Sequence, residues 1–118
     1  MKPRIRLYLE VDTVAHGLTI KNAIQNKIAG KDIFEIHDFD FGVGNMSDPN
    51  VVWGFLEVRF NSQTDYDEVR DWIKDQVQNH PQIKVWITKA TITTHDCSHD
   101  DAEIKDCTTT NYVEWARV

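Results

Sequence analysis

Apolar and polar positions alternate along several short segments of the chain. The first such run consists of Ile5, Leu7, Leu9 and Val11. A two-residue period is typical of a strand with one buried face. The segments 33–41 and 51–60 alternate in the same way, and a change of apolar parity near His37 indicates a bulge in the first of them. The pattern therefore predicts three strands before residue 61.

Two other segments repeat apolar residues at helical spacing. The first contains Ile20, Ala23, Ile24 and Ile28, and the second contains Tyr66, Val69, Trp72, Ile73, Gln76 and Val77. Thr19 and Thr64 are the expected N-caps, Gly30 is placed to end the first helix, and His80 with Pro81 ends the second. The chain therefore alternates strands with two helices.

The remaining segments complete an α+β pattern. Residues 83–93 predict a fourth strand, and 111–118 can form another. The order strand, helix, strand, strand, helix, strand predicts a ferredoxin-like βαββαβ sandwich, an antiparallel sheet with two helices on one face, plus a C-terminal loop and an extra strand. We expect one domain over 1–118, with a core at 4–93, an acidic loop at 94–110 and the terminal strand at 111–118.

The net charge and the length of the apolar runs limit which partners we expect. The chain has 118 residues, with 13 Lys and Arg against 19 Asp and Glu, so its net charge is −6. This charge opposes non-specific binding to nucleic-acid backbones. No apolar run is long enough to span a membrane, and the first residues do not form a secretory signal, so we expect a cytoplasmic location.

The sheet face directed away from the helices carries the main candidate binding residues. Alternation places Tyr8, Trp53, Phe55 and Trp86 there, with Arg6 and Arg59 among them. Aromatic rings interleaved with cations on an open sheet are used to bind single-stranded RNA, because bases stack on rings while Arg contacts phosphate. Packing, self-association as a homodimer and binding of a protein are the alternatives for the same residues.

These strands carry a resemblance to a known family. LYLEVD at 7–12 and VVWGFLEV at 51–58 resemble the two signature strands of the RNA-recognition motif, and the similarity extends over residues 4–90. The resemblance implies that Tyr8, Trp53 and Phe55 stack on bases, with Gly54 as the small residue between two of them. The sequence departs from the family at Val51, Val52 and Val58.

The stretch THDCSHDD at 94–101 carries the candidate metal chemistry. If the fourth strand continues, His95, Cys97 and His99 project to one face, and Cys107 can return to them through the loop. Such nitrogen and sulfur ligands suit zinc. The alternative is a solvated acidic loop without a cofactor.

A catalytic hypothesis, a metal-dependent hydrolase, combines the 94–101 stretch either with HDFD at 37–40 or with Asp12. In HDFD, His37 would act as general base, with Asp38 or Asp40 to orient it or to bind a metal. No nucleophile elbow, phosphate-binding loop or dinucleotide fingerprint is present in the sequence. We therefore expect a non-catalytic binding module, inhibitory or regulatory, that binds a protein through the aromatic sheet face or the acidic C-terminal loop. An RNA-binding module and a metal-dependent hydrolase are the alternatives.

Overall fold

The structure is a computed structural model that describes residues 3–95 and 110–116, with only the backbone described for Asp38, Phe39, His95 and 110–116. Its elements are β1 (Arg4–Val11), α1 (Val14–Ile28), β2 (Ile33–Val43), β3 (Val52–Phe60), α2 (Gln63–Asn79), α3 (Ile83–Trp86), β4 (Ile87–His95) and β5 (Thr110–Ala116). The predicted α+β class is confirmed.

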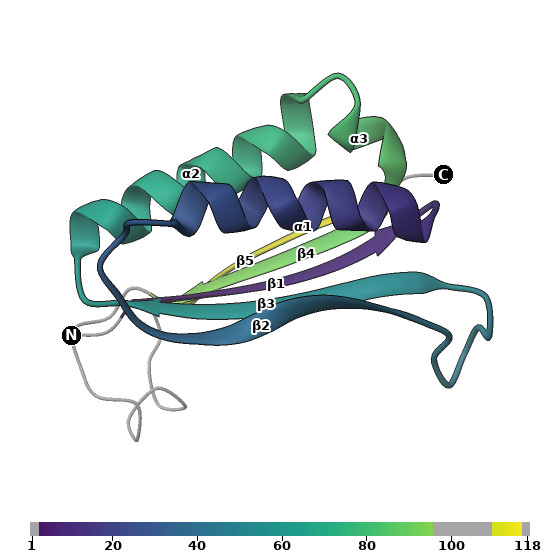
Figure 1. Cartoon of the computed structure of the whole chain (residues 1–118), viewed down its shortest axis with the longest axis horizontal. Coiled ribbons are helices and arrows are strands. Elements are labelled where there is room, and N and C mark those ends of the chain that lie inside the picture. The colour runs from purple at the N-terminus through teal and green to yellow at the C-terminus, as the bar shows by residue number, and fades with distance from the viewer. Residues whose placement is uncertain (1–2, 96–109, 117–118) are drawn as a thin grey trace.

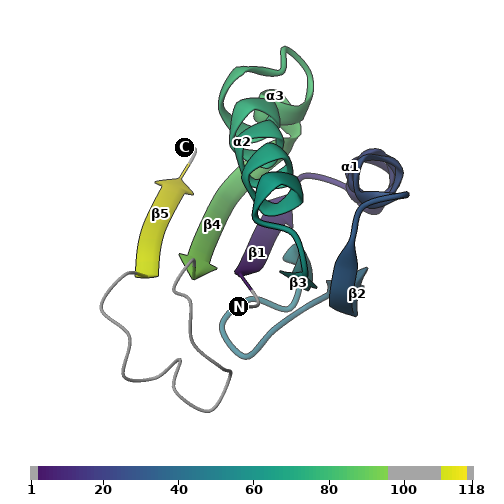
Figure 2. The ribbon, with the colours of Figure 1, turned by 90° about the vertical axis from the view of Figure 1, so that its left-hand side faces the viewer.

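All five strands form one antiparallel sheet in the order β2-β3-β1-β4-β5. Helices α1 and α2 lie side by side over one face of it, and none of the described helices covers the opposite face (Figures 1 and 2). Strand β5 pairs with β4, from Lys89 opposite Ala116 to His95 opposite Thr110. One broad face of the sheet is therefore free of the described helices, and we call it the helix-free face.

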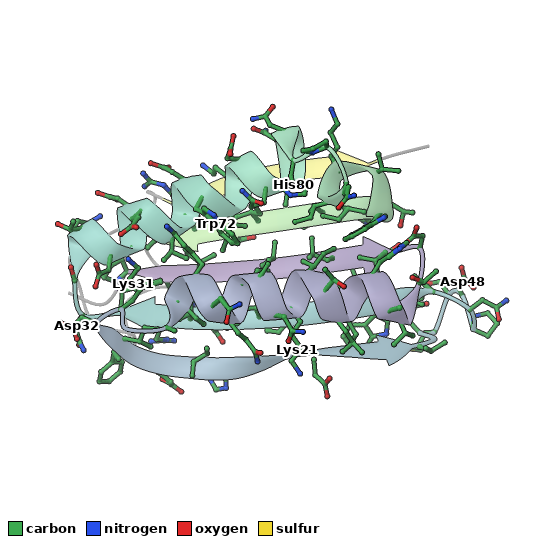
Figure 3. All side chains as sticks on the ribbon, turned by 45° about the horizontal axis from the view of Figure 1, so that its top comes forward. Lys21, Lys31, Asp32, Asp48, Trp72 and His80 are labelled. Atoms are coloured by element: carbon green, nitrogen blue, oxygen red, sulfur yellow. The ribbon has the colours of Figure 1, made fainter. Side chains whose placement is uncertain are left out.

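The hydrophobic core fills the space between the sheet and the two helices. The alternating residues of β1 and β3 and the helical stripes meet there, as the sequence pattern predicts. The buried core includes Ile5, Leu7, Leu9, Val11, Ile20, Ile24, Ile28, Val52, Leu56, Val58, Phe60, Tyr66, Val69, Ile73 and Val77. Trp72 packs against this core and points between the helices, where the Lys27 ammonium lies 5.9 Å from its ring centroid (Figure 3). Burial of these side chains supplies most of the driving force for folding.

Both helices begin at a residue other than the expected one. The Thr13 side chain accepts a hydrogen bond of 3.1 Å from the His16 amide, so α1 begins more than a turn before Thr19. Thr19 lies inside the helix, where its hydroxyl donates to the Ala15 carbonyl. Similarly, Ser62 and not Thr64 is the N-cap of α2. An N-cap needs extended backbone angles as well as a hydroxyl, and Thr13 and Ser62 have them.

The segment expected to form the fourth strand begins with a helical turn. Residues 83–86 form α3, and the ring Nδ1 of His80 accepts hydrogen bonds from the amides of Gln82 at 3.2 Å and Ile83 at 3.1 Å. These bonds satisfy amides at the start of the turn. The predicted strand 83–93 is therefore wrong in its first residues, and β4 begins at Ile87.

Strand β2 is irregular where a bulge is predicted. Its register against β3 shifts between His37 and Asp40, and a second shift lies between Ile33 and Glu35. His37 lies opposite Glu57 and Asp40 lies opposite Phe55, so both face the side of the sheet without helices. The bulge prediction is confirmed.

Among the residues that the structure describes, no helix combines the length and the apolar character required to cross a membrane.

Candidate functional site

Three aromatic residues of the two adjacent strands β1 and β3 lie together on the helix-free face. Tyr8 alternates with buried Leu7 and Leu9, and Trp53 and Phe55 alternate with buried residues of β3. In the register of the two strands Tyr8 lies directly opposite Phe55. We call Tyr8, Trp53 and Phe55, with Arg6 and Arg59 beside them, the aromatic face.

Tyr8 and Trp53 form a stacked pair. Their ring centroids are 6.2 Å apart and their planes are inclined by 28°. The indole nitrogen of Trp53 also donates a hydrogen bond of 3.0 Å to the Gly44 carbonyl at the end of β2. Gly42 lies opposite Trp53 in the register, and a Cβ atom built on it would stand 3.9 Å from the indole, an ordinary contact distance. The Trp53 ring is therefore held in one orientation.

The Tyr8 hydroxyl is tied to a carboxylate. It donates a hydrogen bond of 2.8 Å to Oε2 of Glu10 on the same strand. Partial burial and this bond, together with the negative charge of Glu10, raise the pKa of Tyr8 to about 12. The phenol therefore stays neutral at physiological pH and presents an apolar ring with a fixed polar end.

Phe55 is the most exposed ring of the three. It exposes 38% of its surface, whereas Tyr8 and Trp53 are half-buried. Its ring has no polar atom to satisfy, and it lies at the centre of β3 between Trp53 and Glu57. Phe55 is consequently the side chain of this face with the most apolar area to gain from burial against another molecule.

The cations near these rings surround one acidic side chain. The carboxylate of Glu57 accepts a hydrogen bond of 3.0 Å from Nε of Arg6 and lies 3.6 Å from Nη1 of Arg4. His37 Nε2 is 3.8 Å from its other oxygen. The Glu57 side chain is only 12% exposed, whereas that of Arg6 is 46% exposed. Glu57 therefore offsets the positive charge of buried Arg4 and exposed Arg6.

The sequence analysis did not select Glu57, although its parity in β3 is that of Trp53 and Phe55. Its neighbours become visible only with the strand register, which places it between Arg6 on β1 and His37 on β2. Arg59 lies opposite Arg4 in the same register and is half-buried on this face.

Trp86 does not belong to the aromatic face, so its predicted position is wrong. It lies in α3 and packs against the core, and its ring stacks on His16 with centroids 4.1 Å apart and planes inclined by 9°. The Trp86 carbonyl accepts a hydrogen bond of 2.9 Å from the Asp12 amide. Trp86 therefore joins α3 to the start of α1.

His16 also forms a pair with an acidic residue, which the sequence analysis missed. Its Nδ1 lies 2.8 Å from a carboxylate oxygen of Asp12 at the end of β1. Asp12 also accepts a hydrogen bond of 2.8 Å from the amide of Thr13, the N-cap residue of α1. The pair closes the turn between β1 and α1. Helical spacing from Asp12 to His16 is the signal that could have indicated it.

The candidate catalytic residues His37 and Asp40 of β2 each contact a different charged residue. His37 Nε2 lies 2.9 Å from Glu35, and Asp40 lies 3.7 Å from Lys21 of α1. The side chain of Asp38 lies outside the described residues. A metal-dependent hydrolase stays a prediction without a described site.

The candidate zinc ligands Cys97, His99 and Cys107 lie outside the described residues, and only the backbone of His95 is described, within β4. Elsewhere in the described part of the chain, no three His, Cys, Asp or Glu side chains converge in a way that could hold a metal ion. Of the expected acidic loop at 94–110, the structure describes only residues 94, 95 and 110.

Comparisons of the chain with protein-family models, with curated proteins and with solved structures found no match.

Proposed function

We propose that this chain is a small non-catalytic binding module, with an inhibitory or regulatory role, that binds a protein partner through the aromatic face. The observation that supports the proposal most is the position of Glu57 beneath Arg6 and Arg4. Because this carboxylate offsets their charge, the rings are surrounded by mixed and compensated charges. Protein interfaces commonly combine aromatic anchors with such a polar rim.

We also infer that the fold is ferredoxin-like. The order of the first four strands, β2-β3-β1-β4, and the two helices on one face support this assignment. A ferredoxin-like sheet hosts many unrelated functions, so the fold by itself does not choose among them. The aromatic face therefore carries the functional argument.

Binding of single-stranded RNA is the second candidate. It is favoured by the direct pairing of Tyr8 with Phe55 across the two adjacent strands β1 and β3, which puts two rings where consecutive bases could stack. Two observations favour a protein instead. The Tyr8 hydroxyl is bonded to the carboxylate of Glu10, which puts a negative charge beside the ring pair, and Arg6 is bonded to Glu57, which offsets its attraction for phosphate. Negative charge close to the stacking rings repels phosphate.

The test is photo-crosslinking from inside the aromatic face. Benzoylphenylalanine replaces Phe55 in one variant and Val85 in a matched variant, because Val85 is also an exposed apolar residue but lies in α3. Both variants are irradiated in extracts of cells that produce the protein. We expect a protein adduct that forms from position 55 and not from position 85.

The same irradiation distinguishes the two candidate partners. A ribonuclease-sensitive adduct at position 55, together with binding of labelled single-stranded oligouridine or oligoadenine by the purified chain, would establish the RNA alternative. Equal adducts from both positions would show that the aromatic face has no selective role and would overturn the proposal. The identified protein is then purified, so that its affinity can be measured directly.

A further inference from the structure

Strand β2 forms one edge of the sheet and leaves apolar side chains uncovered. It is the longest of the described strands at 11 residues, and it pairs only with β3 (Figure 1). Ile36 is 42% exposed and Val43 is 61% exposed. Both lie opposite buried residues of β3, Val58 and Val52, and therefore face the helix side of the sheet. The apolar helix side of the sheet thus reaches the edge of β2, where Ile36 and Val43 stay exposed.

The neighbouring flank of α1 continues this apolar strip. Lys21 of α1 lies 3.7 Å from Asp40 of β2, which identifies the flank of the helix that faces β2 (Figure 3). Leu18 and Val14 lie one and two turns before Lys21 on this flank, and both are exposed. A strand added beside β2 would therefore meet apolar side chains of both the sheet and the helix.

The backbone of β2 is also able to accept another strand. The Gly44 amide donates a hydrogen bond of 2.7 Å to the Val51 carbonyl next to β3, so the Phe41 amide, three residues earlier, points the other way, toward the open edge, where it donates 2.9 Å to the side chain of Asp40. Phe41 lies opposite Gly54 and Ile36 lies opposite Val58. Gly54 and Val58 are four residues apart on β3, so their two partners on β2 have the same orientation relative to β3. In an antiparallel ladder, residues of one parity direct their amides away from the neighbouring strand. The amides of Ile36 and Phe41 therefore both face the edge.

We propose that β2 is a dimerisation edge, where a second copy of this chain adds its own β2 antiparallel. In the register that we infer, Ile36 lies opposite Phe41 of the second copy. The edge-facing amide of each residue can then donate to the carbonyl of the other, and their apolar side chains lie on the same face of the sheet. His37 then lies opposite Asp40 of the second copy, and Glu35 lies opposite Gly42. This register joins a histidine to a carboxylate twice and places no acidic residue against another among these pairs.

The bulge places His37 and Asp40 on the same face of the sheet, as this self-pairing requires. His37 and Asp40 are three residues apart, and without an extra residue between them they would lie on opposite faces. A register shifted by two residues would set Glu35 against Asp40 of the second copy, and like charges opposite one another destabilise a sheet. Charge therefore disfavours that shifted register.

The dimer would be independent of the proposed partner-binding function. Its two-fold axis runs perpendicular to the sheet, so two aromatic faces would lie on the same side of one continuous sheet. In the single chain the Asp40 carboxylate accepts a hydrogen bond from the Phe41 amide. In the dimer this amide would bond to the second copy, and the carboxylate could then pair with His37 of that copy. A dimer of this kind presents two binding faces to one partner surface.

Sedimentation velocity over a range of protein concentrations tests the proposal. We expect a species of twice the 13.7 kDa chain mass. Ile36→Lys should weaken the dimer by roughly tenfold or more, because it places a charge in the paired apolar strip. Val85→Lys, at an equally accessible apolar residue on α3, is the control and should leave the dimer intact. A single-chain mass at every concentration would overturn the proposal, as would equal effects of the two variants.

Disulfide trapping tests the register without relying on the stability of a lysine variant. The variants His37→Cys and Asp40→Cys are made in a background with Cys97→Ser and Cys107→Ser. Residues 37 and 40 of the two copies would form a non-hydrogen-bonded pair, whose short Cα separation suits a disulfide. We expect a covalent dimer when the two variants are mixed under mild oxidation. If each variant alone crosslinks as well as the mixture, the proposed register is wrong.

Discussion

The ring of Phe41 lies directly over the backbone of Gly54. A Cβ atom built on Gly54 would stand 2.8 Å from the ring, and one built on Gly17 of α1 would stand 3.0 Å from it. The ring therefore fills the space between helix and sheet where both offer only backbone. Gly54 is small because it faces the helix side, and not because it separates two base-stacking rings.

The first prediction follows from this contact. Gly54→Ala should lower the free energy of unfolding by about 1–3 kcal/mol, because the added methyl group overpacks a site bounded by an aromatic ring. Urea denaturation measures the effect. Gly42→Ala is the matched control on the other face, since its Cβ would stand 3.9 Å from Trp53, an ordinary contact distance. If Gly42→Ala lowered the free energy of unfolding more than Gly54→Ala, contact with the Phe41 ring would not be the reason why residue 54 must be small.

The second prediction concerns the ionisation of Tyr8. Its pKa is raised from 10.0 to about 12, so the neutral phenol is favoured in the folded chain. The corresponding stability is fully present below pH 10 and is lost as the pH rises toward 12. Ultraviolet titration of tyrosinate in the wild type and in Tyr8→Phe isolates this group by difference. Glu10→Gln should lower the pKa of Tyr8, whereas an unchanged titration would contradict the role given to Glu10.

The third prediction concerns the carboxylate beneath the cations. Glu57→Gln should destabilise the fold by about 2 kcal/mol, because it leaves positive charge at a largely buried position without its compensating carboxylate. Arg6→Gln should have a smaller effect, since its side chain is 46% exposed. Thermal unfolding of the two variants compares them. Equal losses would mean that Glu57 acts only through Arg6.

The fourth prediction separates two candidate helix caps. Ser62→Ala should destabilise the chain by about 1 kcal/mol, because the Ser62 hydroxyl accepts from an amide at the start of α2. Thr64→Ala removes a hydroxyl from inside the helix and should cost less. Chemical denaturation of both variants gives the comparison, and a larger loss for Thr64→Ala would place the cap where the sequence pattern put it.

The sequence predicts the sheet core well because the alternation of Ile5, Leu7 and Leu9 records which face of a strand is buried. It also predicts the bulge of β2, since a change of parity has no other simple explanation. It fails at helix starts, where several hydroxyl residues compete and backbone angles decide. Thr13 is chosen over Thr19 because the chain is still extended there.

The sequence likewise predicts one part of the candidate site and misses another. Parity alone places Tyr8, Trp53 and Phe55 on one face, and the structure brings them together. Trp86 was misplaced because an apolar run gives no sign of a helical turn started by the ring of His80. The role of Glu57 depends on three strands aligned in register, and no local sequence pattern records a contact of that kind.

Binding of a protein by the aromatic face is tested most directly by isothermal titration calorimetry. The partner identified by crosslinking from position 55 is purified and titrated into the wild-type chain and into its variants. Phe55→Ala should weaken the complex by roughly tenfold or more, because an exposed aromatic anchor at the centre of an interface carries much of the affinity. Val85→Ala, which truncates an exposed apolar residue on α3, should leave the affinity unchanged. If Phe55→Ala binds as tightly as the wild type, or if only Val85→Ala loses affinity, the aromatic face is not the binding surface.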